Sequence, residues 1–453
     1  MNDVTLDGLS VVGRGSGISA SGYAGGVTPP EDPCRDAPPR RDRRTWPERA
    51  AGYGACIDRT SAGIDPHAWG VEPGYDDVSG TWHDSDPDAV DAVLAAMGAH
   101  TPTPPGPQET DVWVVNPGRA VPCEGRWVLH TETGRRMEGD GPLPAGLELG
   151  YHDLERRDAP QRVRVIVAPP ACYRDTGSRR WGWAAQLYAL RSRSSWGIGD
   201  LADLAELGRW SRSVGADVVL VNPLHAPLPV LPLENSPYFP SSRSFRNPIY
   251  IRVEDVPGSA GLADVSAAAA AGRALNETPL IDRDSVWRLK LSALEAVWAA
   301  MTPEQRDGQG DVAAYRARIG ETLESYATFC TLTEVHGAGW RSWPAGLERH
   351  DTDATREFAA GHADRVAFHV WLQYLLDRQL EHAGASGGVV SDLAIGTDRE
   401  GADAWRWQDV MANDVCVGAP PDDFNPAGQN WGFAPYDPWK LRAARFEPYI
   451  EVV

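Results

Sequence analysis

Residues 196–225, "WGIGDLADLAELGRWSRSVGADVVLVNPLH", decide the fold class. Apolar residues at helical spacing mark one inner face of the first half: Leu201, Leu204, Ala205, Leu207 and Gly208. Asp200 precedes them and is a suitable helix cap. The second half, "DVVLVNPLH" (217–225), is rich in β-branched residues, as is typical of a parallel strand buried on both sides. The stretch therefore predicts a βαβ unit in an α/β protein.

The flanking segments extend this pattern. "AAQLYALRS" (184–192) is a short apolar run before the helix, and "GGVVSDLAIGTD" (387–398) predicts another buried strand that ends in a carboxylate. Residues 263–385 are mostly helical in pattern, and Asp284 or Ser285 is the expected cap of a helix at 284–300. Two or three barrel-type strands are thus expected, separated by a helical insertion at about 255–385.

The N-terminal third has a different character. Residues 1–62 are rich in Gly, Pro, Arg and Asp without a sustained period, which predicts a disordered leader. A short helix is expected at 86–100, capped by Asp86 or Asp88. Three strand-like runs follow at 111–116, 126–132 and 162–170. Residues 63–172 therefore predict an N-terminal extension with a small antiparallel β-sandwich, and residues 173–453 the α/β part.

Composition excludes several functions. The 453 residues carry a net charge of −20, which argues against binding to nucleic acid and to anionic membrane surfaces. The six cysteines include no CxxC pair and lie far apart, which favours reduced thiols in a cytoplasmic protein over a zinc site. The sequence starts without a signal peptide and contains no run long enough to span a bilayer. The 18 Trp fit either a coding bias or carbohydrate stacking, and composition leaves both open.

Two polar clusters follow the predicted strands, where α/β folds bind ligands. The first is a Pro-rich loop at 222–251, in which prolines bracket Tyr238. A rigid aromatic ring is a good platform for a sugar, and we favour this reading over a packed core tyrosine. His225 is expected to be structural or a hydrogen-bond partner. The second is Asp392, which either caps the next element or binds sugar hydroxyls.

A third cluster lies in the loop at 418–437. Its amides and aromatic rings suit a sugar, although an ordinary ordered loop is the alternative: Phe424, Gln429, Asn430, Trp431, Phe433 and Tyr436. The chain has no nucleophile elbow, no HExxH run and no Walker loop. Paired-carboxylate glycoside chemistry cannot be tested by spacing alone.

These clusters, in this order, resemble the 4-α-glucanotransferases, the amylomaltase or disproportionating-enzyme family with an α-amylase-type barrel. The matching stretches run from about 180 to 453: "QLYALRSRSSWGIGDLADLAEL", "GADVVLVNPLHAPLP", "NSPYFPSSRSFRNPIYI", "LIDRDSVWRLK", "FHVWLQYLLDRQL" and "VGAPPDDFNPAGQNWGFAPYDP". The resemblance implies transfer of α-1,4-glucan segments, from maltooligosaccharides, glycogen or starch fragments, to the 4-OH of glucose or another glucan. It implies a retaining mechanism through a glycosyl-enzyme and needs no cofactor or metal.

The resemblance also assigns binding roles. Tyr238 matches the tyrosine that stacks beneath the donor glucose, and Asp392 matches a carboxylate that binds sugar after the third barrel strand. Phe424 and Trp431 match the loop that grips the glucan, together with the amides Gln429 and Asn430. Asp423 stands where the family often has an aromatic residue.

One family feature is absent from these residues. The family's nucleophilic Asp lies in an Arg-X-Asp-His run shortly after the helix that begins here at Pro448, and its acid/base Glu and a His-Asp pair come later. Residues 440–453 contain no such run, so the catalytic residues are expected beyond Val453. The fold expected is a partial (β/α)8 TIM barrel with its first strands only, in a truncated, inactive and poorly soluble chain. An α-glucan hydrolase and a non-catalytic glucan-binding remnant are the alternatives.

Overall fold

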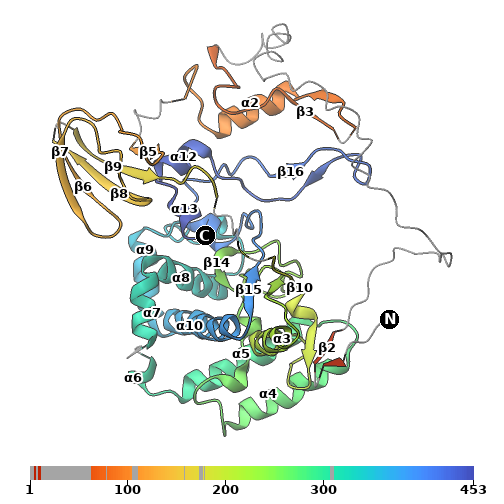
Figure 1. The fold of residues 1–453 in the computed structure, drawn as a ribbon. Helices are drawn as coiled ribbons and strands as arrows, with labels where there is room; N and C mark the ends of the chain where they lie inside the picture. The colour runs from red at the N-terminus through yellow and green to blue at the C-terminus, as the bar shows by residue number, and fades with distance from the viewer. Residues whose placement is uncertain are drawn as a thin grey trace.

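An N-terminal sheet and an α/β body form separate parts of the computed structural model (Figure 1). The structure describes residues 5–6, 9–11, 63–77, 79–104, 111–157, 159–172, 177, 179–306 and 311–452. Most of the expected leader lies outside these described residues. Within it, β1 (Thr5–Leu6) pairs with β2 (Leu9–Val11), and β2 pairs with β11 (Leu190–Ser192).

Three parallel strands organise the α/β body. β10 (Gly182–Ala185), β12 (Val218–Val221) and β15 (Gly388–Ser391) lie in the order β10-β12-β15, and both pairings are parallel. Helix α3 (Leu201–Ser213) connects β10 to β12, which confirms the predicted helix and the βαβ unit. The carboxyl ends of all three strands therefore meet at one edge of the sheet.

Only one face of this sheet is covered. Val219 and Val221 are buried in the core that α3 and α10 (Ala363–Ser386) also line. On the other face, the side chains of Leu220 and Val390 are 41% and 45% exposed. The prediction of strands buried on both faces was wrong, because no element among the described residues covers this second face and the apolar run alone cannot reveal that.

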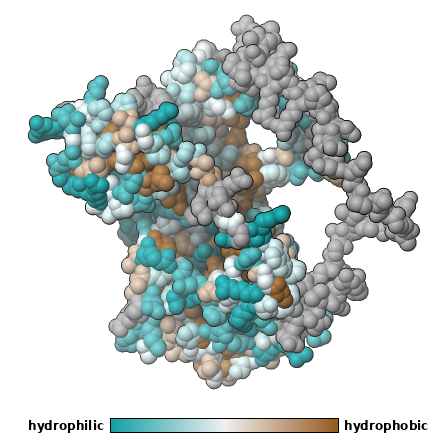
Figure 2. Space-filling model, in the orientation of Figure 1, coloured by the Kyte–Doolittle hydropathy of each residue, from teal (hydrophilic) through white to brown (hydrophobic). Residues whose placement is uncertain are grey.

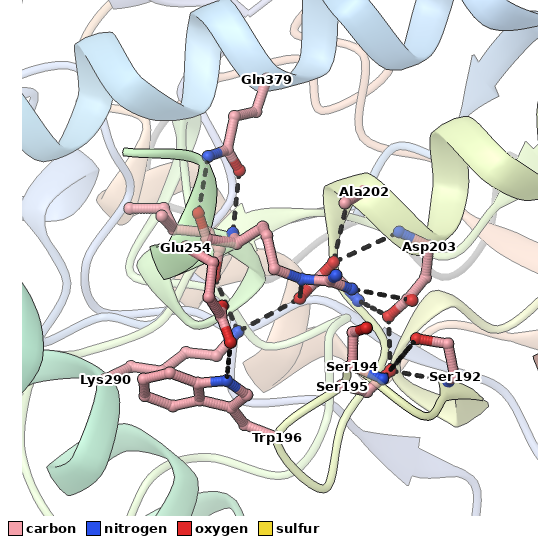
Figure 3. A network of polar contacts seen from close by, with 12 residues as sticks. Ser192, Ser194, Ser195, Trp196, Ala202, Asp203, Glu254, Lys290 and Gln379 are labelled. Carbon is pink, nitrogen blue, oxygen red and sulfur yellow. Dashed lines mark hydrogen bonds and ion pairs between the residues drawn. The ribbon is translucent and has the colours of Figure 1, made fainter. Parts of the chain in front are cut away.

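A buried ionic network holds the start of α3 (Figure 3). The Asp200 carboxylate caps the helix, as predicted, by accepting from the backbone N–H groups of Ala202 (3.0 Å) and Asp203 (3.2 Å). Arg252 donates to Asp200 from Nε at 2.6 Å and to Asp203 from Nη2 at 2.8 Å. The Lys290 ammonium lies 3.8 Å from the Asp200 carboxylate. It also donates to the backbone carbonyls of Ile249 and Ile251. Two buried carboxylates thus face two buried cations.

The same network joins several elements. Lys290 comes from α5 (Arg283–Ala300), and Gln379 of α10 exchanges two 2.9 Å hydrogen bonds with the backbone of Arg252. Burial and the nearby charge of Asp200 raise the pKa of Asp203 to about 6, against the opposing charge of Arg252. Burial lowers the pKa of Lys290, and the charge of Asp200 opposes this. The arrangement is stable only while each charge keeps its partners.

The region between β12 and β15 is largely helical, as predicted. Its helices are α4 (Ala263–Ala274), α5, α6 (Pro303–Arg306), α7 (Asp311–Ile319), α8 (Glu321–His336), α9 (Asp353–Gly361) and α10, with short 3-10 turns η3 (Pro248–Tyr250), η4 (Val253–Asp255), η5 (Leu275–Glu277) and η6 (Trp340–Ser342). The cap of α5 is Asp282, whose carboxylate accepts from Ser285 N–H at 3.0 Å, rather than Asp284 or Ser285. Asp284 instead accepts from Leu233 N–H at 2.8 Å, so tertiary contact overrides the local signal.

Tryptophan builds much of the interior. The buried tryptophans include more than half of the 18 in the chain: Trp69, Trp113, Trp127, Trp196, Trp287, Trp298, Trp340, Trp343, Trp371 and Trp405. Several of them pack edge-on or tilted against other rings, as the Trp298–Trp371 pair does at 5.5 Å. More than half of the tryptophans therefore serve packing.

The N-terminal part departs from its prediction. Helix α2 (Pro87–Ala96) is capped by Asp86, as expected, and follows the hairpin of β3 (Gly74–Asp76) and β4 (Trp82–Asp84). The strands form one sheet in the order β5-β9-β8-β6-β7: β5 (Val112–Val115), β6 (Arg126–His130), β7 (Arg136–Asp140), β8 (Gly150–Arg156) and β9 (Ala159–Val167). Since β5 and β9 are parallel, this is a single mixed sheet rather than the expected antiparallel sandwich. Strand β8 was not predicted.

The C-terminal segments connect the two parts. They are α11 (Ala402–Arg406), β16 (Gly418–Ala419), β17 (Gln429–Asn430), α12 (Pro438–Ala443) and α13 (Glu447–Ile450). Arg442 of α12 donates to the Val112 carbonyl at 2.8 Å, and Trp439 meets Trp69 edge-to-face at 5.7 Å. Figure 2 shows hydrophilic residues over much of both parts in this view, with hydrophobic residues gathered where they meet.

Among the described residues, no helix is long and apolar enough to cross a membrane. Those residues also hold no group of three or more His, Cys, Asp or Glu side chains that could bind a metal ion.

The ionic network predicts a large stability effect. Replacing Arg252 with Ala leaves two carboxylates buried without their guanidinium, so the free energy of unfolding should fall by about 3–5 kcal/mol. Urea unfolding at pH 7, followed by circular dichroism, measures the loss. Arg378→Ala is the control, because its pair with Glu381 is solvent-exposed and should contribute at most about 1 kcal/mol. Equal losses in both variants would contradict the role given to Arg252.

Candidate functional site

A hairpin directly after β12 carries the first site residue. Strand β13 (His225–Ala226) pairs antiparallel with β14 (Ser242–Arg246), and the Pro-rich segment joins them. Tyr238 lies on this segment with its side chain 45% exposed. Because proline restricts the backbone on both sides, the ring is held in place without being buried. This is the geometry of an aromatic platform.

Tyr238 is in direct contact with Asp392. Its hydroxyl donates to Asp392 Oδ2 at 2.8 Å, across 154 positions of sequence. Asp392 follows β15, and its backbone N–H donates to the Val221 carbonyl at 3.1 Å, which continues the pairing of β12 and β15. The other carboxylate oxygen accepts from Leu393 N–H at 2.9 Å. We call these two residues the Tyr238–Asp392 pair.

The pair lies beyond the carboxyl ends of parallel strands, where sequence reasoning expected ligands. The hydrogen bond to Asp392, with burial and the negative charge of that carboxylate, raises the pKa of Tyr238. The phenol is therefore neutral at physiological pH and acts as a donor.

His225 supports the segment next to Asp392. Its Nε2 accepts from Ala394 N–H at 3.3 Å. Burial, together with the positive charges of Arg243 and Arg246, lowers the pKa of His225 to about 4. The imidazole is neutral near pH 7, which fits the expectation of a hydrogen-bond partner rather than a base.

A cavity of about 580 Å³ opens beside the pair. His225, Arg243, Arg246, Ser391 and Asp392 are among the residues that line it. Its volume and polar lining suit a small hydroxylated ligand. A larger cavity, of about 740 Å³, lies among α8, α9 and α10, away from the Tyr238–Asp392 pair. We take the smaller one as the site because only it contains a residue of the pair.

The remaining predicted residues lie on a hairpin that we call the arm, residues 417–433. Strands β16 and β17 pair along it, and the Val417 carbonyl accepts from Trp431 N–H at 3.0 Å (Figure 1). The Gln429 amide oxygen accepts from the Trp431 indole at 3.2 Å, and the Asn430 amide oxygen accepts from a backbone N–H at 2.9 Å. Phe424 is 92% exposed.

The predicted residues thus form two groups. Tyr238 and Asp392 touch each other, whereas Phe424, Gln429, Asn430 and Trp431 lie together on the arm. Among the described residues, no hydrogen bond or ring contact joins these four arm side chains to the Tyr238–Asp392 pair. A ligand that contacted both groups would have to span that space or draw the arm closer.

Two aromatic residues have other roles than expected. Phe433 is buried and stacks on Phe239, the neighbour of Tyr238, with ring centroids 5.1 Å apart. The Tyr436 hydroxyl accepts from Arg243 Nη2 at 3.2 Å. Both anchor the base of the arm instead of facing a sugar. Sequence reasoning missed Arg243, since nothing in "SSRSFRNPIYI" separates it from the other arginine of that run.

The geometry permits binding more readily than bond cleavage. An exposed ring offers a face for sugar C–H groups, and the carboxylate beside it can accept from hydroxyls. Glycoside cleavage requires two carboxyl groups about 5–10 Å apart on either side of the bond, whereas the pair supplies one. The pair by itself therefore lacks the second carboxyl group that cleavage requires.

The fold is a glycoside-hydrolase-like α/β fold. Residues 185–453, more than half of the chain, match the 4-alpha-glucanotransferase family. The chain belongs to that family, as the resemblance of its motifs implied.

Individual relatives agree. The 4-alpha-glucanotransferase of Mycobacterium tuberculosis is 42% identical over 356 residues, which are 73% of this chain and 47% of the relative. The enzyme of the same name from Haemophilus influenzae is 32% identical over 346 residues, or 69% of this chain and 48% of the relative. The chain therefore spans about half the length of the curated relatives it matches.

Solved structures show the same likeness. The amylomaltase of Corynebacterium glutamicum superposes with a TM-score of 0.71 and 29% identity, covering 85% of this chain and 62% of the other. An amylomaltase from Streptococcus agalactiae, solved in complex with acarbose, gives a TM-score of 0.51 at 16% identity over 61% of this chain and supports the fold alone.

The hydrogen bond within the pair can be tested by titration. In Asp392→Asn the carboxylate charge is lost, so the raised pKa of Tyr238 should fall toward the ordinary tyrosine value of about 10. Carbon-13 labelling of the tyrosine Cζ atoms allows NMR titration, and Tyr238→Phe identifies the signal. An unchanged pKa in Asp392→Asn would show that the two groups do not interact in solution.

Proposed function

We propose that this protein transfers α-1,4-glucan segments to the 4-OH of glucose or of another glucan, as a retaining 4-α-glucanotransferase. The observation that carries the proposal is the Tyr238–Asp392 contact beside an open cavity, in a chain of this family. A glucose ring on Tyr238 would place its hydroxyls within reach of the carboxylate. We further propose that β10, β12 and β15 are the first strands of a (β/α)8 barrel and that the protein is cytoplasmic.

The pair has unused hydrogen-bond acceptor positions and an exposed ring face, and both support a sugar ligand. Each Asp392 oxygen accepts one hydrogen bond within the protein, so lone pairs remain for hydroxyl donors. The Tyr238 ring keeps an exposed face, because only its hydroxyl is engaged. Stacking and hydrogen bonding would therefore act on the same sugar unit from two directions.

The arm supplies the second half of the proposal. The Gln429 and Asn430 amide oxygens already accept hydrogen bonds within the arm, and their NH₂ groups remain available as donors to a glucan. Phe424 and Trp431 offer rings to neighbouring units. A glucan that runs from the pair to the arm would bury the ring of Phe424, whose exposure is otherwise unfavourable.

The chemistry itself requires groups other than the pair. In a retaining transfer, a carboxylate attacks C1, a carboxylic acid protonates the leaving oxygen, and the acceptor hydroxyl then replaces the enzyme at C1. Tyr238 and Asp392 orient the donor unit for this step. The 453 residues contain no Arg-X-Asp-His run of the kind that carries the family's nucleophile.

Binding is the first test of this function. We expect the 453-residue chain to bind maltoheptaose, and Tyr238→Ala to weaken binding about tenfold, or about 1.4 kcal/mol, through lost stacking. Isothermal titration calorimetry measures both, with acarbose as a second ligand.

The matched control for binding is Tyr151→Ala, since Tyr151 is a partly exposed tyrosine on β8 of the N-terminal sheet. It should bind like the unaltered chain. If no glucan binds, or if both substitutions weaken binding equally, the proposed subsite is wrong.

Turnover is a separate prediction. Because these residues lack the Arg-X-Asp-His run, we expect the 453-residue chain assayed alone to release no glucose from maltotriose. A glucose oxidase assay measures release, and chromatography of the products separates transfer from hydrolysis. Glucose release that disappears in Tyr238→Ala would contradict this expectation and place the nucleophile within the chain.

A further inference from the structure

Arg243 lies between the Tyr238–Asp392 pair and the arm. It is on β14, and its side chain is 8% exposed. Its backbone N–H donates to the Asp403 carboxylate at 2.8 Å, so the main chain at this position is fixed to α11. The backbone position from which the guanidinium extends is therefore set by the fold.

On one side, the guanidinium holds the segment that carries Asp392. Arg243 Nη1 donates to the carbonyls of Ala394 at 3.3 Å and Ile395 at 3.2 Å. His225 accepts from the N–H of the same Ala394. Both backbone polar groups of Ala394 are thus engaged by the β13–β14 hairpin, which fixes the backbone two residues after Asp392.

On the other side, the guanidinium holds the base of the arm. Nη2 donates to the Tyr436 hydroxyl, and the guanidinium carbon lies 5.6 Å from the centre of the Tyr436 ring. Tyr436 in turn bridges to Met411, so this end of the arm is fixed to the body. Stacking of Phe433 on Phe239 is a second, independent link between the arm and the body.

We propose that Arg243 is a positioning residue that sets the arm relative to Asp392, so that one glucan can contact both. This inference rests on the proposed function. A lysine cannot replace it, because a single ammonium lacks the planar fork that serves two carbonyls and a phenol at once. The Phe239–Phe433 stack should keep the arm folded when the fork is lost, so the variant tests positioning rather than folding.

A double-mutant cycle tests the coupling. We would prepare Arg243→Lys, Tyr436→Phe and the double variant, and measure the Kd for maltoheptaose and the thermal midpoint of each. Arg252→Lys is the matched control, since Arg252 is equally buried but is bonded to Asp200 and Asp203 instead. The Cζ signal of Tyr238 reports displacement of Asp392 without any ligand.

We expect Arg243→Lys to weaken binding about tenfold and Tyr436→Phe several-fold, with the double variant no more than about twofold weaker than Arg243→Lys, because the two residues act as one unit. Arg252→Lys should lower the thermal midpoint and leave Kd unchanged. Additive losses, or an unaltered Kd in Arg243→Lys at a temperature where it is folded, would overturn the inference.

Glucan binding by the unaltered chain tests the proposed function, and the Tyr238 signal tests the inference about Arg243. If the unaltered chain binds no glucan, the proposed function fails. The Tyr238 signal still decides the structural part: it should shift in Arg243→Lys and stay in place in Arg252→Lys. An unshifted signal in Arg243→Lys would show that Arg243 does not hold the Asp392 segment.

Discussion

The buried contact of Arg252 with Asp200 and Asp203 is the constraint on which the rest of the α/β body depends. Asp200 begins α3, and Arg252 ends the long polar segment that contains Tyr238, so one guanidinium fixes the helix against the loop. Gln379 extends the same contact to α10, whose C-terminal end leads into β15 and Asp392. The stability of the body that supports the pair therefore depends on charges that cannot be exposed to water or left unpaired without a large cost.

Local signals predicted the parts of the fold that depend on neighbouring residues. The Asp200 cap, helix α3, the helical insertion and the strand before Asp392 follow from spacing and capping within a few residues. Long-range contacts decided the rest. Asp284 was a plausible cap of α5, but its carboxylate accepts a hydrogen bond from the Leu233 N–H. Asp282 caps the helix instead. The parallel pairing of β5 with β9 requires a crossover connection between the two strands. Alternation of apolar residues along each strand does not indicate such a connection.

The candidate site shows the same division. Residue type and position next to strand ends indicated Tyr238 and Asp392, although their 2.8 Å contact required the fold. The aromatic residues of the loop at 418–437 all looked alike in sequence, yet Phe433 and Tyr436 are anchors and Phe424 is exposed. Exposure separates these roles, and a single sequence contains no measure of it. Arg243 went unnoticed for a related reason, since a buried arginine and a solvated one read identically.

Within the described part of the chain, the arm is a hairpin held at one end. Its base is tied to the body by Phe433 and Tyr436, while the turn around Phe424 touches little else. Changes in the length of that turn would alter loop entropy by only about 0.6 kcal/mol per doubling and would leave the base intact. Insertions or deletions in the turn should therefore be tolerated far more readily than changes at the base, because the contacts that position the arm lie outside the turn.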